Sequence, residues 1–263
     1  MQTSAFDRYQ AGDSAIHRLD PRVKVIITVL FVLSNVLIPD GAWLGFVLAL
    51  TMILIITNWA GLAWDFVLKR SLIVLPFALA AVTVIFAVPG VALASIHIGP
   101  WTLTPTDAGL IRFISILVRS LLSVQMAILL TATTPFPDLI HALRHLRLPQ
   151  PLVATLSFMY RYLAVLSDET TRLLRARRAR SAQQPGMHSG GPLLWRARVA
   201  GNMVGQLFLR SLERGDRVYK AMLARGYTGH LYTLNPHVMQ RHDWLMAALA
   251  LAVLAAIQIL SRL

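Results

Sequence analysis

The chain has 263 residues, of which 56% are hydrophobic and 14% are charged, and it contains no cysteine. Soluble domains carry about 25% charged residues, so much of this surface does not face water, and disulfides and thiolate metal sites are excluded. The formal net charge is +13, but 16 of the 25 Lys and Arg lie within residues 132–242. This clustering is typical of basic loops beside a membrane, so we predict a polytopic membrane protein that does not bind nucleic acid.

The first 22 residues are polar, and they end at a predicted helix start. Asp20 is a good N-cap and Pro21 suits the first helical position, so a helix should begin at Pro21. Lys24 follows one turn later, where its aliphatic stem would let the ammonium group reach the lipid headgroups. Residues 1–22 are therefore assigned to an N-terminal segment outside the hydrocarbon layer.

Five apolar runs are each long enough, at about 17–21 residues, to cross a hydrocarbon core of about 30 Å. They are the predicted spans Val23–Pro39, Trp43–Trp59, Ser71–Val88, Leu110–Thr131 and Trp244–Leu260. The first four lie within residues 23–131 and the last within residues 243–263. Residues 152–166 are apolar enough for a sixth, shallow or re-entrant element, although Tyr160 and Arg161 favour the interface. The predicted fold is an all-α polytopic membrane protein with five to six transmembrane helices.

The distribution of Lys and Arg over the connecting segments predicts an orientation. The loops 39–42 and 89–109 contain neither residue, whereas the N-terminus, the loop 58–71 and the segment 132–242 contain nearly all of them. Basic loops are retained in the cytoplasm. The N-terminus is therefore expected inside and, with five spans, the C-terminus outside.

Residues 132–242 are expected to form a cytoplasmic and interfacial domain of one short and two long helices. The short helix, Asp138–Leu148, is basic and amphipathic. The long helices cover Leu152–Ala182 and Leu193–Arg225, with the Gly- and Pro-containing linker Gln183–Pro192 between them. At 1.5 Å per residue the first long helix would measure roughly 45 Å, so it must extend well beyond the membrane.

Each long helix ends on an arginine between small residues. The two triplets are Ala179-Arg180-Ser181 and Ala224-Arg225-Gly226, and Gly226 is predicted as the C′ residue, where positive φ costs little. A guanidinium group clear of other bulk can make a bidentate bond to a carboxylate of a partner. Arginine near a helix C-terminus also caps carbonyl groups, so one triplet alone does not decide between these roles. Two copies, each closing a long helix, favour partner binding.

Four stretches resemble the transmembrane T component of energy-coupling factor transporters, and specifically its cobalt-type CbiQ branch. They are Gly12–Lys24, Thr131–Pro149, Tyr160–Tyr162 and Arg210–Gly229. The resemblance extends over nearly the whole chain and implies two coupling helices that cross. It implies that the triplets at Arg180 and Arg225 insert into grooves on ATP-binding-cassette ATPases, with Ser181 standing where the family usually has glycine.

The resemblance also implies the partners and the substrate. Two ATPase subunits would hold ATP and Mg²⁺, so no cofactor is expected in this chain, which has no Walker-type loop of its own. A second membrane subunit would bind the substrate, with cobalt as the first expectation, then nickel, then a vitamin. The implied location is the bacterial or archaeal cell membrane, and the implied role is a non-catalytic scaffold that transmits ATPase motion.

Other residues leave alternatives open. His141 and His145 have i,i+4 spacing, but they have no third ligand nearby and are expected on the surface of an interfacial helix rather than at a metal. Arg119 lies deep in the fourth predicted span, where it either holds the bundle together or contacts the substrate-binding subunit. A membrane-embedded lipid enzyme would need acids or histidines at membrane depth, and an independent channel would need more polar residues along the spans. The predicted spans provide neither.

Overall fold

The structure is a computed structural model that describes residues 9–91, 96–98, 101–146, 148–180, 192–229 and 239–262. The chain forms two compact units, one of residues 1–145 with 236–263 and one of residues 146–235. The short predicted helix of the 132–242 segment lies in the first unit and the two long helices in the second. Each unit is described by itself.

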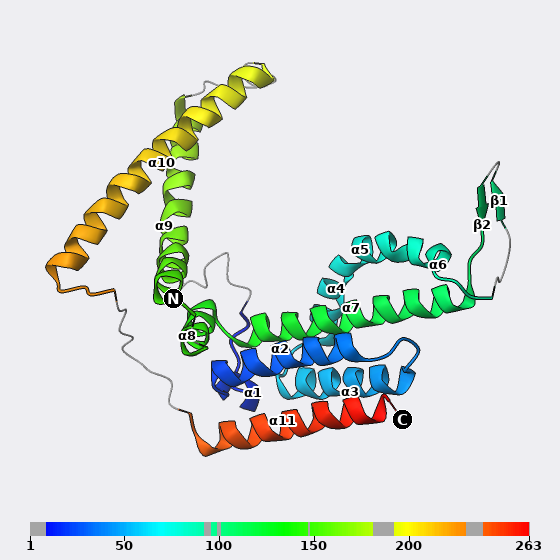
Figure 1. Cartoon of the computed structure of the whole chain (residues 1–263). Helices are drawn as coiled ribbons and strands as arrows, with labels where there is room; N and C mark the ends of the chain where they lie inside the picture. Colours follow the sequence, from blue (N-terminus) through cyan, green and yellow to red (C-terminus); the bar gives the residue numbers. More distant parts are fainter. Residues whose placement is uncertain are drawn as a thin grey trace. The chain divides into compact units, whose positions relative to one another are not determined.

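The first unit is helical, with one short hairpin (Figure 1). Its elements are α1 (Ala15–Arg18), α2 (Pro21–Leu37), α3 (Trp43–Trp59), α4 (Trp64–Ser71), η1 (Leu72–Val74), α5 (Leu75–Ala80), η2 (Ala81–Thr83), α6 (Val84–Ala87), β1 (Ile96–Ile98), β2 (Trp101–Leu103), α7 (Asp107–Thr133), α8 (Phe136–His145) and α11 (Arg241–Leu260). The predicted all-α class is confirmed, and the antiparallel pair β1 and β2 is a small addition within the polar loop before α7.

Helices α2, α3, α7 and α11 pack side by side around the core of the first unit (Figure 1). Buried apolar side chains from all four helices meet there, among them Phe31, Ile53, Leu129 and Ile257. Many apolar side chains on the outside of the same helices remain exposed. A soluble protein rarely exposes so large an apolar area, so this surface is suited to lipid or to partner helices.

Helix α2 begins as predicted, but Lys24 does not reach outward. Asp20 is the N-cap, and its Oδ1 accepts a hydrogen bond of 2.8 Å from the Arg22 amide. Lys24 is only 8% exposed, and its ammonium group donates to the His17 and Thr133 carbonyls, each at 3.1 Å. The headgroup-reaching prediction for Lys24 is therefore wrong, because the ends of α1 and α7 satisfy the ammonium inside the protein.

The predicted third span is not one straight helix. The segment from Trp64 to Ala87 consists of short α and 3₁₀ pieces and bends by 58°. Pro76 lies near the bend, and its ring removes one backbone N–H and clashes with the preceding turn. By length and composition, α7 and α11 are each able to cross a membrane. The two parts of the bent segment, Trp64–Phe77 and Ala81–Ala87, together form a third candidate. Helix α3 is apolar but has 17 residues, so the five-span count stays a prediction.

The second unit consists of two long helices, α9 (Gln150–Arg180) and α10 (Leu193–Ala224). Both start and end within two residues of the predicted limits. Residues 152–166 form the first half of α9, which continues without a break into its arginine-rich second half. Helix α9 is not among the helices apolar enough to cross a membrane, so the structure gives no support to a sixth span there.

Candidate functional site

The C-terminal end of α10 is shaped by Gly226. Arg225 is the C-cap, and Gly226 has a φ of +81°. The Gly226 amide donates to the Leu223 carbonyl and the Tyr227 amide donates to the Met222 carbonyl, both at 3.0 Å. These two bonds define a Schellman motif, which satisfies the last carbonyls with backbone donors alone. The predicted C′ position of Gly226 is confirmed, and the Arg225 side chain is not needed as a cap.

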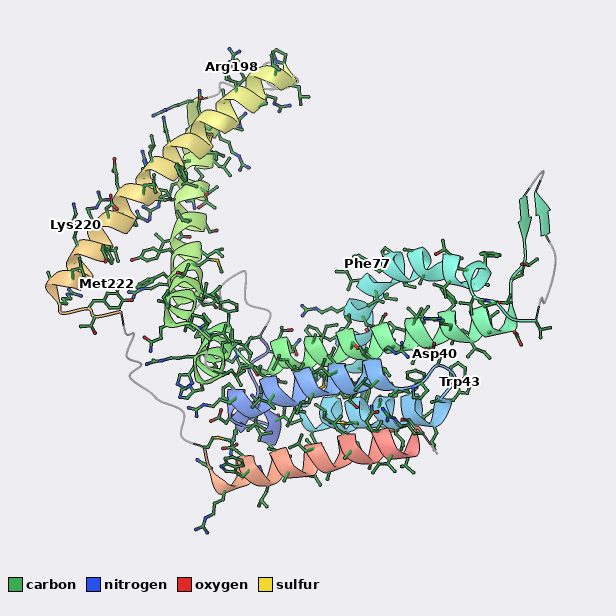
Figure 2. All side chains as sticks on the ribbon, viewed as in Figure 1. Asp40, Trp43, Phe77, Arg198, Lys220 and Met222 are labelled. Atoms are coloured by element: carbon green, nitrogen blue, oxygen red, sulfur yellow. The ribbon has the colours of Figure 1, made fainter. Side chains whose placement is uncertain are left out.

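The surroundings of Arg225 are open. Ala224, Arg225 and Gly226 are all exposed, and a Cβ placed on Gly226 would meet no atom within 4 Å. Among the described residues, the Arg225 guanidinium group has no hydrogen-bond or ion-pair partner. Figure 2 labels Lys220 and Met222 near this end of α10, and Arg225 follows them in the chain. The guanidinium group is available to a carboxylate of another protein.

The rest of α10 is a solvated scaffold for this tip. It buries no residue within the chain, and apolar side chains such as Phe208 and Leu212 are exposed. Glu213 and Arg217 form an i,i+4 ion pair at 3.8 Å, with both side chains 69% exposed. Such exposed pairs contribute at most about 1 kcal/mol, so they support the helix rather than define the site.

The end of α9 presents a second arginine. Arg180 is the last residue of α9, and it and Ala179 are exposed. Its guanidinium group also has no partner within the part of the second unit that is described. Ser181, the third member of the predicted triplet, lies outside the described residues. The structure therefore presents Arg180 at a helix end, as it does Arg225.

Helices α9 and α10 touch each other near their middles. The Arg210 guanidinium group of α10 bonds to the Glu169 carboxylate of α9. Next to this pair lies a cleft of about 390 Å³ lined by Thr155, Phe158, Met159, Tyr162, Leu166, Ser211, Arg214 and Gly215. The first half of α9 thus faces the second half of α10. The two helices are therefore antiparallel where they touch.

This geometry separates the two arginines. From Glu169, Arg180 lies about 16 Å further along α9, and from Arg210, Arg225 lies about 22 Å further along α10 in the other direction. Figure 1 shows the end of α9 beside the first half of α10, while the end of α10 diverges from α9. The arginines therefore form two separate contact points, not one shared pocket.

Arg119, the deep arginine of α7, joins two helices of the first unit. Its NH2 group donates to the Ile38 carbonyl at 2.8 Å and to the Asp40 carboxylate at 3.0 Å, and Arg112 lies 3.6 Å from the same carboxylate. Arg119 thus caps the C-terminal end of α2 and ties it to α7. Of the two predicted roles, these contacts correspond to holding the bundle together. Sequence reasoning missed Asp40 because it stands in a short turn far from α7 in the chain.

The start of α11 is tied to the start of α2. Asp243 accepts from the Asp20 amide at 3.1 Å and from the Gln240 amide at 2.8 Å, and it is 6% exposed. The sequence signal was the spacing of Gln240 and Asp243, which forms a capping box at the N-terminus of α11. The contact with Asp20 spans 223 residues and has no local signal.

Of the two histidines of α8, His145 is exposed as predicted and His141 is not. His141 is buried, so the expectation that it lies on the helix surface is wrong, and the physical reason is that α8 packs against α2. His145 Nδ1 lies 3.0 Å from the His141 carbonyl, and the two rings are 4.6 Å apart. Across the described part of the chain, no group of three His, Cys, Asp or Glu residues is placed to hold a metal ion.

The family model described as CbiQ, cobalt transport protein, matches residues 12–236. The chain belongs to this family. It is 31% identical over 240 residues to the energy-coupling factor transporter transmembrane protein EcfT of Lactococcus lactis subsp. cremoris, covering 87% of this chain and 86% of that protein. It is also 31% identical over 268 residues to the EcfT protein of Lacticaseibacillus paracasei, covering 97% of both chains. This CbiQ-family chain is thus a membrane component of a transporter and not itself an enzyme.

Proposed function

We propose that this CbiQ-family chain couples ATP hydrolysis by two partner ATPases to uptake of a divalent metal ion through a partner membrane subunit. Arg180 and Arg225 are the contacts to the ATPases, one for each. The single observation that carries this proposal is the C-terminal end of α10. There a Schellman motif satisfies the backbone, and the Arg225 guanidinium group is left exposed and unbonded within the described structure.

Two further features support the assignment of roles. The arginines lie on opposite sides of the contact between α9 and α10, which suits two separate ATPase subunits. The helices α9 and α10, at 31 and 32 residues, are long enough to carry a displacement from one end to the other as rigid elements. In this scheme nucleotide binding draws the ATPases together, α9 and α10 change their crossing angle, and the substrate-binding subunit tilts.

The family description favours cobalt as the transported ion, with nickel second. The ion would be held by the partner subunit, since the described residues of this chain offer no cluster of metal ligands. ATP and Mg²⁺ would be held by the ATPases. The excess of Lys and Arg in residues 132–242 favours a cytoplasmic location for α9, α10 and the N-terminus in a cell membrane.

The test is a double charge reversal, Arg180→Glu with Arg225→Glu, in the chain co-expressed with its partner subunits. We expect the ATPases to be lost on affinity purification while the variant remains in the membrane with its substrate-binding partner. The matched control is Arg172→Glu with Arg217→Glu, because both are exposed arginines of the same helices and each stands eight residues before the arginine at the helix end. It makes the same change in net charge and should retain the ATPases.

Normal recovery of the ATPases with the double variant would contradict the proposal. Loss of the ATPases from the control as well would mean that net charge, not the two helix ends, governs binding. Uptake of radioactive cobalt and nickel by cells that express the whole set of subunits identifies the ion. Vitamin uptake in place of metal uptake would refute the substrate part alone.

A further inference from the structure

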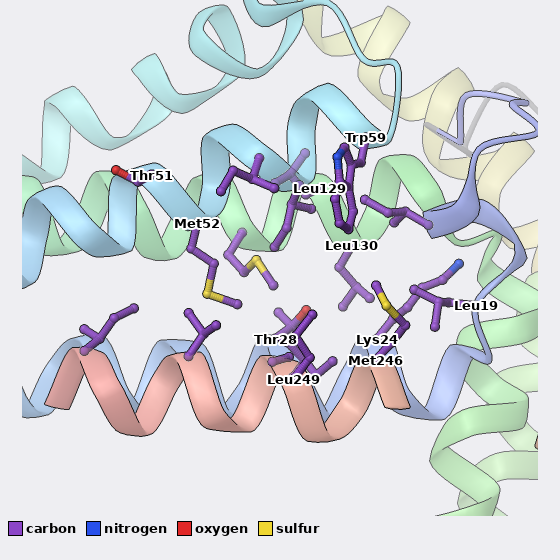
Figure 3. A pocket seen from close by; sticks show the side chains of 18 of the residues that line it. Leu19, Lys24, Thr28, Thr51, Met52, Trp59, Leu129, Leu130, Met246 and Leu249 are labelled. Atoms are coloured by element: carbon purple, nitrogen blue, oxygen red, sulfur yellow. The ribbon is translucent and has the colours of Figure 1, made fainter. Parts of the chain in front are cut away.

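A long apolar groove lies between α3, α7 and α11 of the first unit, and the role proposed above for α9 and α10 does not use it. Its volume is about 490 Å³. Figure 3 shows side chains of α3 on one wall and of α11 on the other, with Lys24, Leu19 and Trp59 at one end and Thr51 toward the other. We propose that this groove holds one acyl chain of a membrane phospholipid whose phosphate lies at the Lys24 end.

The lining is suited to hydrocarbon because it is almost entirely apolar, and three of its few polar residues are already hydrogen-bonded within the chain. The Thr51 hydroxyl donates to the Val47 carbonyl and the Thr133 hydroxyl donates to the Leu129 carbonyl, both at 2.8 Å. The Lys24 ammonium group bonds to two backbone carbonyls. A polar ligand would find little to bind along the walls, whereas burying apolar surface stabilises a hydrocarbon chain.

The length of the groove suits an acyl chain. The lining residues of α11 run from Met246 to Leu260, a length of about 21 Å. A length of about 21 Å exceeds half of a hydrocarbon core of about 30 Å, so one leaflet's acyl chain fits along it.

The charges at the Lys24 end favour a phosphate. The buried carboxylates of Asp20 and Asp243 are engaged by backbone amides and have Lys24 nearby as a counter-charge. Arg18 and Arg241 are exposed, and each stands two residues from one member of the Asp20 to Asp243 hydrogen bond, so both lie at this rim. Two exposed arginines thus stand near this end of the groove, and their positive charge suits a phospholipid headgroup.

The experiment uses the full chain in nanodiscs that contain phosphatidylglycerol with a photoreactive diazirine in its acyl chain. After irradiation, mass spectrometry locates the adducts. We expect enrichment on groove-lining residues such as Met52, Met246 and Val253 over exposed positions outside the groove such as Leu251. Adducts spread evenly over lining and outer positions would mean bulk lipid contact only, and would overturn the proposal.

Matched substitutions test the groove directly. Ala256→Trp fills it, whereas Ala255→Trp adds the same side chain at the neighbouring exposed position outside it. We expect groove adducts to fall roughly fivefold or more in the first variant and to stay unchanged in the second. Thr51→Trp obstructs the opposite wall, with Leu54→Trp as its exposed control, and keeps the test decisive if one variant does not fold. Equal labelling in the obstructed and control variants would refute an acyl chain in the groove.

The headgroup part has its own test. Replacing Arg18 and Arg241 by Gln should lower groove labelling by phosphatidylglycerol roughly fivefold for each arginine. A diacylglycerol with the same photoreactive chain should label the groove weakly in the unaltered protein and equally weakly in this variant. Equal labelling by the two lipids in the unaltered protein would overturn the assignment of the phosphate to this rim.

Discussion

Separate replacement of Arg180 and Arg225 by Ala is the sharpest test of the two-contact arrangement. A hydrogen bond to a charged partner contributes about 1.5–3 kcal/mol net, so each replacement should weaken binding of the ATPase dimer roughly 10–150-fold. The two residues leave the Glu169 to Arg210 contact in opposite directions, by about 16 Å and about 22 Å. At such separations free energies add, so the double variant should lose the sum to within about 0.5 kcal/mol.

The assay measures the affinity of the purified ATPase dimer for the chain held in nanodiscs. The unaltered chain, the two single variants and the double variant are compared at the same salt concentration. Arg→Lys at either position keeps the charge but loses the planar fork, so it should recover only part of the affinity. A coupling energy above about 1 kcal/mol would show that both arginines enter one site, which refutes the reasoning. Unchanged affinity in either single variant would refute the role of that residue.

Four further substitutions test what stabilises individual helix ends and buried groups. Gly226→Ala forces a left-handed φ on a residue with a Cβ, so it should destabilise the end of α10 by about 1–2 kcal/mol. The measurement is hydrogen exchange, which should become faster in the last turn of α10. Gly205→Ala in the middle of the same helix has open space around the added Cβ and should stabilise α10 by about 0.5–1 kcal/mol. Asp243→Ala leaves the buried Asp20 amide without its acceptor and should lower the free energy of unfolding by about 1–3 kcal/mol in chemical denaturation; an unchanged value would mean that water replaces the carboxylate. Burial lowers the pKa of His17, so the folded protein favours the neutral imidazole ring. The neutral ring therefore contributes to stability above about pH 6.5, and this contribution is lost as the pH falls. The thermal midpoint should therefore drop more between about pH 7.5 and 5.5 in the unaltered chain than in His17→Gln, and parallel curves would contradict this.

Local signals in the sequence were enough to place the long helices and the two helix ends that carry Arg180 and Arg225, but not the short pieces from Trp64 to Ala87. Asp20 and Pro21 marked the start of α2, and Gly226 marked the end of α10, because capping and left-handed φ depend on a few neighbouring residues. The apolar runs located α2, α3, α7 and α11 to within a few residues. The exposed position of Arg225 at a helix end could be predicted for the same reason, since the cap lies within one helical turn.

Only the tertiary structure decided where polar side chains inside the first unit find partners. Lys24 binds the end of α7, Arg119 caps α2, and Asp243 binds the start of α2, over separations of 81 to 223 residues. The burial of His141 and the bend after α4 likewise depend on neighbours in space. The lipid groove also arises only when α3, α7 and α11 come together. The sequence alone determined most of the long helices and which arginines end them, because those are short-range properties. Packing determined which charges are satisfied internally and which, like Arg180 and Arg225, stay exposed.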